Sequence, residues 1–76
     1  MGHKNFDPTY VFHHHHATPE KVAHYNAIHA GAQTFAEIIL AHTPEGADQD
    51  AALQLLRETA MMANAAIALD GRLTKP

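Results

Sequence analysis

The sequence predicts an all-α fold: an antiparallel two-helix hairpin that follows an extended N-terminal arm and assembles into a helical oligomer. Two long stretches carry apolar residues at alternate steps of three and four, the spacing of one helix face. A segment with proline and glycine, 42–48, separates them and suits a tight connection between antiparallel helices. The expected divisions are an arm at 1–17, a hairpin at 18–70 with helices at about 19–41 and 49–69, and a tail at 71–76.

The first helix is predicted to start at Thr18 and Pro19, because threonine is a favoured N-cap and proline fits the first helical position. No formally charged side chain lies between Lys21 and Glu37, which is unusual for a helix that faces water, so other copies of the chain are expected to cover it. Gly31 costs about 1 kcal/mol against alanine and so indicates close approach of a backbone or a ligand. The expected face is Tyr25, Ile28, Ala32, Phe35 and Ile39, with Val22, Ala36 and Leu40 beside it.

The second helix has two apolar rows. The main row is Leu53, Leu56, Ala60, Ala63 and Ile67, and the row beside it is Ala52, Leu55, Met62, Ala66 and Leu69. Together they form an arc too wide for one partner helix. Asp48 or Asp50 is expected to cap the start of this helix, and Gly71 to follow its end.

The N-terminal arm sustains neither a strand period nor a helix period, and is therefore expected to be extended. Its aromatic residues are too apolar for a free tail. The end of the arm at Phe12 is therefore expected to pack against the helices.

Composition limits the classes of function. The chain has 76 residues, the length of a single domain. It has no cysteine, so disulfides cannot stabilise it. The net charge of −3 gives no broad basic surface for long nucleic acid. No apolar run is long enough to cross a membrane and no signal-peptide core is present, so a cytoplasmic location is expected. Among metal, ligand and self-association, the wide apolar arcs favour self-association as the aid to folding.

The histidine run 13–16 is the most conspicuous chemical feature. A pair such as His13 and His15 shares one side of an extended segment and suits a shared metal, although a further ligand would be needed. The alternatives are solvated or locally packed histidines and contact with a ligand. Lys21, His24 and His29 follow on the first helix, and such rings and cations stack on nucleobases and hold phosphate.

No catalytic arrangement is recognisable. Serine and cysteine are both absent, and no paired carboxylates or glycine-rich phosphate loop can be identified, so the chain is not expected to be an enzyme. Asn64 lies amid alanines and is expected to need a hydrogen-bond partner, in the fold rather than in a ligand.

Several motifs between residues 12 and 69 resemble the small phage hairpin proteins that include the anti-CBASS cyclic-nucleotide sponge and, more distantly, the Thoeris anti-defense sponge. The most specific is Met61-x-Ala-Asn-Ala-x-Ile67-Ala. The others are Phe12-x-His-His15, Thr18-Pro-Glu, Tyr25-x-x-Ile28-His29, Phe35-Ala-x-Ile-Ile39, the Pro44 turn and Ala52-Leu-x-x-Leu-x-Glu58. The resemblance implies a phage protein in the host cytoplasm that forms a homo-oligomer, a hexamer, and sequesters cyclic di- or trinucleotides without cleaving them and without a cofactor.

The resemblance also implies a ligand site. The base-stacking aromatic of the family falls on His14 and its polar neighbour on His15. The basic residue after Tyr-x-x-Ile falls on His29, and the arginine common at the end of the second helix falls on Leu69, with Arg72 three residues later. Lys21 is expected to assist. Two other readings stay open: a hairpin that binds and inhibits a host defence protein, and a histidine-based metal-binding protein.

Overall fold

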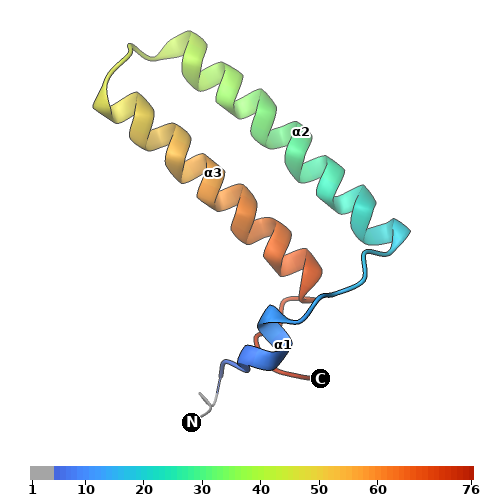
Figure 1. Ribbon diagram of the computed structural model, residues 1–76. Coiled ribbons are helices and arrows are strands. Elements are labelled where there is room, and N and C mark those ends of the chain that lie inside the picture. Colours follow the sequence, from blue (N-terminus) through green and yellow to red (C-terminus); the bar gives the residue numbers. More distant parts are fainter. Residues whose placement is uncertain (1–4) are drawn as a thin grey trace.

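The computed structural model describes residues 5–76, which form three helices and no β-strand. The helices are α1 (Pro8–Phe12), α2 (Pro19–His42) and α3 (Ala47–Ala68). The predicted all-α class is confirmed. Figure 1 shows α2 and α3 side by side and running in opposite directions, with α1 at the open end of the pair beside the C-terminal tail. The first four residues of the predicted arm lie outside the described part of the chain.

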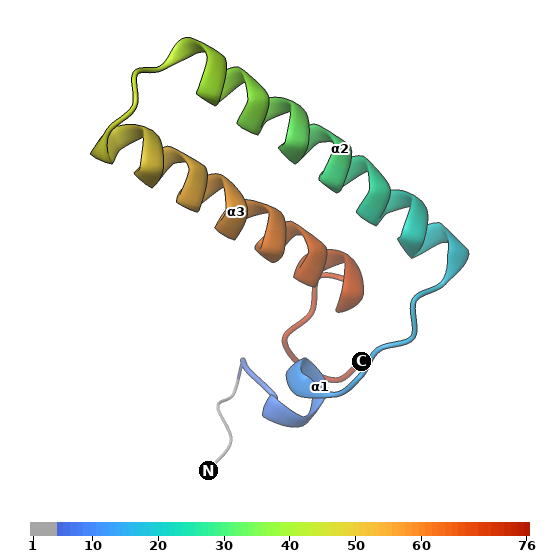
Figure 2. The ribbon, with the colours of Figure 1, turned by 45° about the horizontal axis from the view of Figure 1, so that its top comes forward.

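The α2–α3 pair is a single layer, 45 × 32 × 14 Å in extent with the arm included, and Figure 2 shows the same two antiparallel rods from a second direction. The main apolar row predicted for α3 is half-buried throughout, as the row that faces a neighbouring helix should be. On α2, Tyr25, Ile28, Ala32 and Ala36 are half-buried and Ile39 is buried. These residues form the contact between the two helices.

The start of α2 follows the predicted chemistry. Thr18 Oγ1 accepts a hydrogen bond from the Lys21 amide at 3.1 Å, and Pro19 takes the first helical position. The helix ends at His42, where Thr43 Oγ1 donates to the Ile39 carbonyl at 2.6 Å.

The start of α3 differs from the prediction. The helix begins at Ala47, two residues earlier than expected, with Gly46 as its N-cap and no side-chain cap, so the prediction of a cap by Asp48 or Asp50 is wrong. Both aspartates lie in the first turn instead, where their charge interacts favourably with the helix dipole. The buried Gln49 fixes the connection, since its Nε2 donates to the Thr43 carbonyl at 3.2 Å and to Thr43 Oγ1 at 3.1 Å.

The arm also differs, because it is not extended throughout. Residues 8–12 form the short helix α1, capped by Asp7, whose Oδ1 accepts from the amides of Thr9 at 3.0 Å and Tyr10 at 3.4 Å. Phe12 is 79% exposed, so the expectation that it packs against the helices is wrong. Its ring instead lies 6.2 Å from that of Phe6, within the arm itself.

The single chain has a small core. Ile39 and Leu69 are the only buried hydrophobic residues among those described. Phe35, which the sequence places on the buried face of the first helix, is 54% exposed, and Leu55 and Met62 of the second α3 row are 62% and 66% exposed. Much of the predicted apolar surface therefore faces away from the other helix. Over residues 5–76, each helix is too short or too polar to cross a lipid bilayer.

Candidate functional site

The C-terminal end of α3 is the point where the arm, α2 and the tail meet. Tyr10 donates its hydroxyl to the Leu69 carbonyl at 2.8 Å, and Lys21 donates its ammonium to the Ala68 carbonyl at 3.1 Å. The last carbonyls of a helix have no hydrogen-bond donors within the helix. Here the side chains of Tyr10 and Lys21 act as donors to the carbonyls of Leu69 and Ala68. We call the cluster of Tyr10, His15, Lys21, Leu69 and Asp70 the α3-end junction.

His15 is held in the junction by Tyr10. Its Nε2 lies 2.6 Å from the Tyr10 carbonyl, and its ring meets the Tyr10 ring edge-on at 4.9 Å between centroids. Because a carbonyl only accepts hydrogen bonds, Nε2 carries the proton in this arrangement. The His13 ring lies 6.0 Å from that of His15 at 88°. Three rings of the arm are thus gathered at one end of the molecule.

Lys21 is engaged on two sides. Besides the Ala68 carbonyl, it faces Asp70 with an Nζ to Oδ1 distance of 3.4 Å, and the two side chains are 19% and 67% exposed. A hollow of about 520 Å³ opens beside this pair. It is lined by Thr18, Glu20, Lys21, His24, Ala66, Ile67 and Asp70. Two carboxylates offset the cationic groups there, so the hollow is not strongly positive.

His29 lies elsewhere, eight residues further along α2, or about 12 Å along the helix axis. Its Nε2 lies 3.3 Å from Asn64 Nδ2, an amide nitrogen that only donates hydrogen bonds, so Nε2 accepts. The predicted need of Asn64 for a partner is met for its Nδ2 alone, by this contact with α2. Asn64 Oδ1 is buried and has no hydrogen-bond partner in the part of the chain that the structure describes.

The structure brings together only some of the predicted site residues. His15, Lys21 and Leu69 share the α3-end junction, although the Leu69 side chain is only 7% exposed and its carbonyl carries the contact. His14 is exposed on the segment between α1 and α2. Arg72 folds over its own tail, where its Nε donates to the Thr74 carbonyl at 3.2 Å and its Nη2 to that of Lys75 at 3.3 Å.

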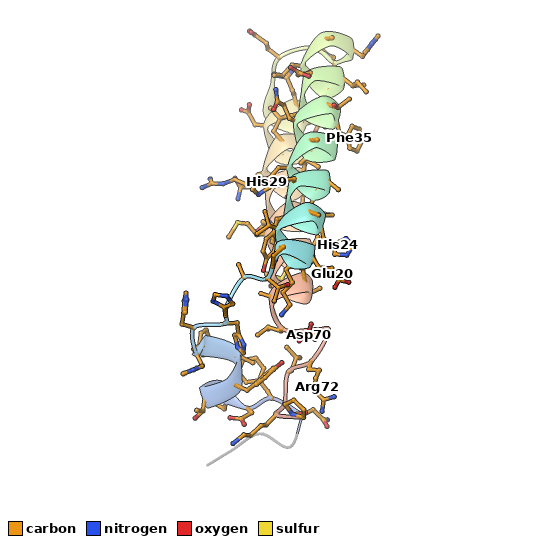
Figure 3. All side chains as sticks on the ribbon, turned by 90° about the vertical axis from the view of Figure 1, so that its right-hand side faces the viewer. Glu20, His24, His29, Phe35, Asp70 and Arg72 are labelled. Carbon is orange, nitrogen blue, oxygen red and sulfur yellow. The ribbon has the colours of Figure 1, made fainter. Side chains whose placement is uncertain are left out.

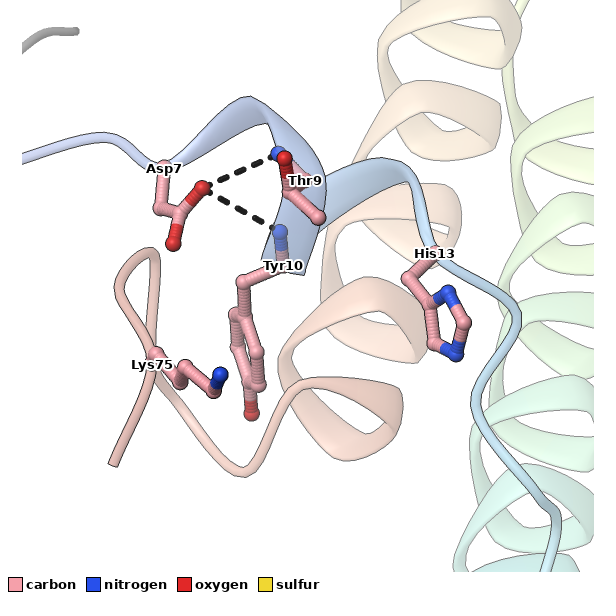
Figure 4. A pocket seen from close by; sticks show the side chains of 5 residues that line it. All are labelled: Asp7, Thr9, Tyr10, His13 and Lys75. Atoms are coloured by element: carbon pink, nitrogen blue, oxygen red, sulfur yellow. Dashed lines mark hydrogen bonds between the residues drawn. The ribbon is translucent and has the colours of Figure 1, made fainter.

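A second hollow beside the arm contains residues that sequence reasoning missed. It measures about 480 Å³ and is lined by Asp7, Thr9, Tyr10, His13 and Lys75, as Figure 4 shows. The arm is joined to the tail here, since the Asp7 amide donates to the Leu73 carbonyl at 2.7 Å. The pair Asp7 and Pro8 repeats the cap-then-proline pattern of Thr18 and Pro19, and it was the one available signal for α1.

The groups gathered around the α3 end are aromatic and imidazole rings, hydroxyls and an ammonium. Such groups stack on bases and contact phosphate. Within residues 5–76, no three histidines, aspartates or glutamates are arranged to hold a metal ion. Comparison of the chain with protein-family models, curated proteins and solved structures finds no match in any of the three.

Proposed function

We propose that this protein is a phage anti-defence protein that binds cyclic di- or trinucleotide messengers and sequesters them without cleavage, which blocks CBASS-type immune signalling in the host cytoplasm. The proposal includes self-association to a homo-oligomer, a hexamer in the family that the sequence resembles. His14, His15 and His29 are the proposed ligand residues, with Lys21 and Arg72 assisting. Leu69 contributes to the site through its backbone carbonyl, which accepts the Tyr10 hydroxyl, and through its buried side chain.

The observation that carries the proposal is the motif resemblance over residues 12–69, above all the run from Met61 to Ala68. Two features of the structure support it. Aromatic and imidazole rings gather at the α3-end junction, and much apolar surface is left for other copies of the chain. Neither feature depends on the resemblance.

The magnitude of binding is adequate for a sponge. Stacking on an aromatic or imidazole ring contributes about 1 to 3 kcal/mol per base, and charge-assisted contacts to phosphate add to it. A cyclic dinucleotide presents two bases and two phosphates. Two subunits that each contribute rings and imidazolium groups would therefore reach useful affinity, even without a fixed cation in the site.

The test is titration calorimetry of the full chain with a panel of cyclic di- and trinucleotides at pH 6.5 and 7.5. Bound ligand is then released by heat and identified by mass. We expect tight binding of at least one messenger, intact release, and a loss of roughly tenfold or more in affinity for His15→Ala and for His29→Ala. His16→Ala is the matched control, since His16 is exposed in the same run but outside the proposed site. Absence of binding across the panel, or release of cleaved ligand, contradicts the proposal.

A second candidate function is a hairpin that binds and inhibits a host defence protein. The exposed hydrophobic side chains favour it, because large exposed apolar residues mark protein-binding surfaces. It predicts a complex with a host protein and no small-molecule ligand. The nucleotide titration therefore separates the two candidates.

A further inference from the structure

The single chain exposes more surface than a compact protein of its size. Its accessible surface is 6046 Å² for a mass of 8.3 kDa. A compact monomer of that mass exposes about 4,600 Å², so the excess is roughly 1,400 Å². A standard interface takes about 800 Å² from each partner. The radius of gyration of 15.7 Å, against about 11 Å for a compact chain of this length, gives the same result.

One stripe of α2 has the spacing of a coiled-coil seam. Its positions follow one another at steps of four, three, four, three and four, the heptad pattern. The residues of this α2 seam are His24, Ile28, Gly31, Phe35, Ile38 and His42. No formally charged residue lies in the seam. Phe35 and Ile38 are 54% and 48% exposed, and Figure 3 shows Phe35 and His24 pointing to the same side of the α2–α3 pair.

The α2 seam is symmetric about residue 33. Each position before residue 33 has a counterpart at the same distance after it: 24 with 42, 28 with 38, and 31 with 35. An antiparallel two-fold contact between two copies sets each position opposite its counterpart. Isoleucine then meets isoleucine, histidine meets histidine, and Phe35 meets Gly31. The residue types that meet in this pairing therefore suit a second copy of the chain as the partner.

The Phe35–Gly31 pairing also fits in shape. A Cβ built on Gly31 meets nothing within 4 Å, so the surface there is open. It belongs to an apolar groove of about 240 Å³ between the two long helices. The groove is lined by Ala27, Ile28, Gly31, Ala32 and Phe35 of α2 and by Leu56, Thr59, Ala60 and Ala63 of α3. An aromatic ring that projects from one copy therefore has a recess in the other.

We infer that two copies of the chain pair through the α2 seam in an antiparallel two-fold contact, with Phe35 of each copy seated over Gly31 of the other. The contact gives the partner surface for the self-association in the proposed function. It needs no nucleotide, so its failure and the failure of ligand binding are observed separately. The number of subunits in any larger assembly is then even.

Sedimentation equilibrium of the full chain without nucleotide tests the contact. Phe35→Ala and Gly31→Phe should each weaken association, by roughly 100-fold for Phe35→Ala because the two-fold axis removes two buried rings at once. The double variant G31F/F35G exchanges ring and recess, keeps one glycine in the helix, and should associate within about tenfold of the wild type. Leu40→Ala is the matched control, since Leu40 is 57% exposed on α2 but lies outside the seam. Circular dichroism confirms that each variant keeps its helices.

Engineered cysteines test the register, and the absence of native cysteine makes the readout clean. A mixture of Ile28→Cys and Ile38→Cys should form a disulfide between two copies, because these positions lie opposite each other in the proposed contact. Either variant alone should not, because the same position in the two copies lies about 15 Å apart along the antiparallel pair. The inference is overturned if the wild type is monomeric, if Phe35→Ala associates like the wild type, if the exchanged variant is no better than the single ones, or if the mixed cysteines cross-link no faster than each alone.

Discussion

Replacing Tyr10 with phenylalanine tests whether the arm is held by the α3-end junction. The change removes only the hydroxyl that donates to the Leu69 carbonyl at 2.8 Å. That carbonyl also accepts the Arg72 amide at 3.0 Å, so it is not left without a partner. The cost is therefore the net value of one hydrogen bond, about 1 kcal/mol, rather than the larger penalty of an orphaned buried group.

The effect should be local to the arm. A five-residue helix is not stable by itself, so α1 forms only while it is docked. The Val11 and His13 amides donate to the Asp7 and Thr9 carbonyls within α1, and their protection from hydrogen exchange reports docking. A loss of about 1 kcal/mol lowers that protection about fivefold. Protection in the middle of α2 and α3 should stay unchanged.

Tyr25→Phe is the matched control for this experiment. Tyr25 is half-buried like Tyr10, and its hydroxyl makes no hydrogen bond within residues 5–76. We expect exchange in α1 to be the same in Tyr25→Phe as in the wild type. If Tyr10→Phe leaves the α1 amides as protected as before, or if both variants expose them equally, the junction does not hold the arm and the reasoning is refuted.

Three further predictions concern the connection, the junction and the ligand. Gly46→Ala should lower the free energy of unfolding in urea by about 1 to 3 kcal/mol, because the backbone angles of Gly46, φ of 155° and ψ of −172°, suit glycine alone. An unchanged urea midpoint would contradict this. Lys21→Met should lower the free energy of unfolding by about 0.5 to 1 kcal/mol at low salt. This loss should shrink at about 1 M salt, because Asp70 is exposed and salt screens its charge. A loss that does not change with salt would indicate lost packing instead. If His29 contacts a phosphate of the ligand, His29→Lys should keep nucleotide affinity in calorimetry while His29→Ala loses it, because lysine carries a fixed positive charge; equal losses in both variants would refute this contact.

The long helices could be predicted from the sequence because their signals are local. The Thr18 cap and Pro19 precede a long periodic stretch, so the start of α2 agrees with the prediction. The same cap-then-proline chemistry at Asp7 and Pro8 starts α1, but five residues are too few to show a helical period. The start of α3 was misplaced because a glycine N-cap leaves no side-chain signal comparable to that of an aspartate.

Phe35 shows why periodicity could not assign the buried face. Ile28 belongs both to the stripe of α2 that meets α3 and to the α2 seam, and steps of three and four lead from it along either stripe. The predicted face followed the stripe that meets α3 except at Phe35, which belongs to the α2 seam. Only the placement of α3 decides which stripe is covered within the chain.

The candidate site was the least predictable part, because its contacts are long-range. Tyr10 meets Leu69, and Lys21 meets Ala68 and Asp70, across separations of 47 to 59 residues. No local pattern marks such a pair. The histidines were found because four in a row are conspicuous, whereas the tyrosine that holds one of them was not.

The partners of the fixed cations determine which groups are left for an anionic ligand. Lys21 is engaged with a carbonyl and a carboxylate, and Arg72 with the carbonyls of its own tail. Their ammonium and guanidinium groups therefore already have partners within the fold, and a phosphate would compete with those contacts. Within residues 5–76, His15 contacts the Tyr10 carbonyl and His29 the Asn64 side chain, so neither ring is held by a carboxylate. His15 and His29 lie at separate places in one chain, so a ligand site that uses both either spans them or draws them from two copies, which would join nucleotide binding to self-association.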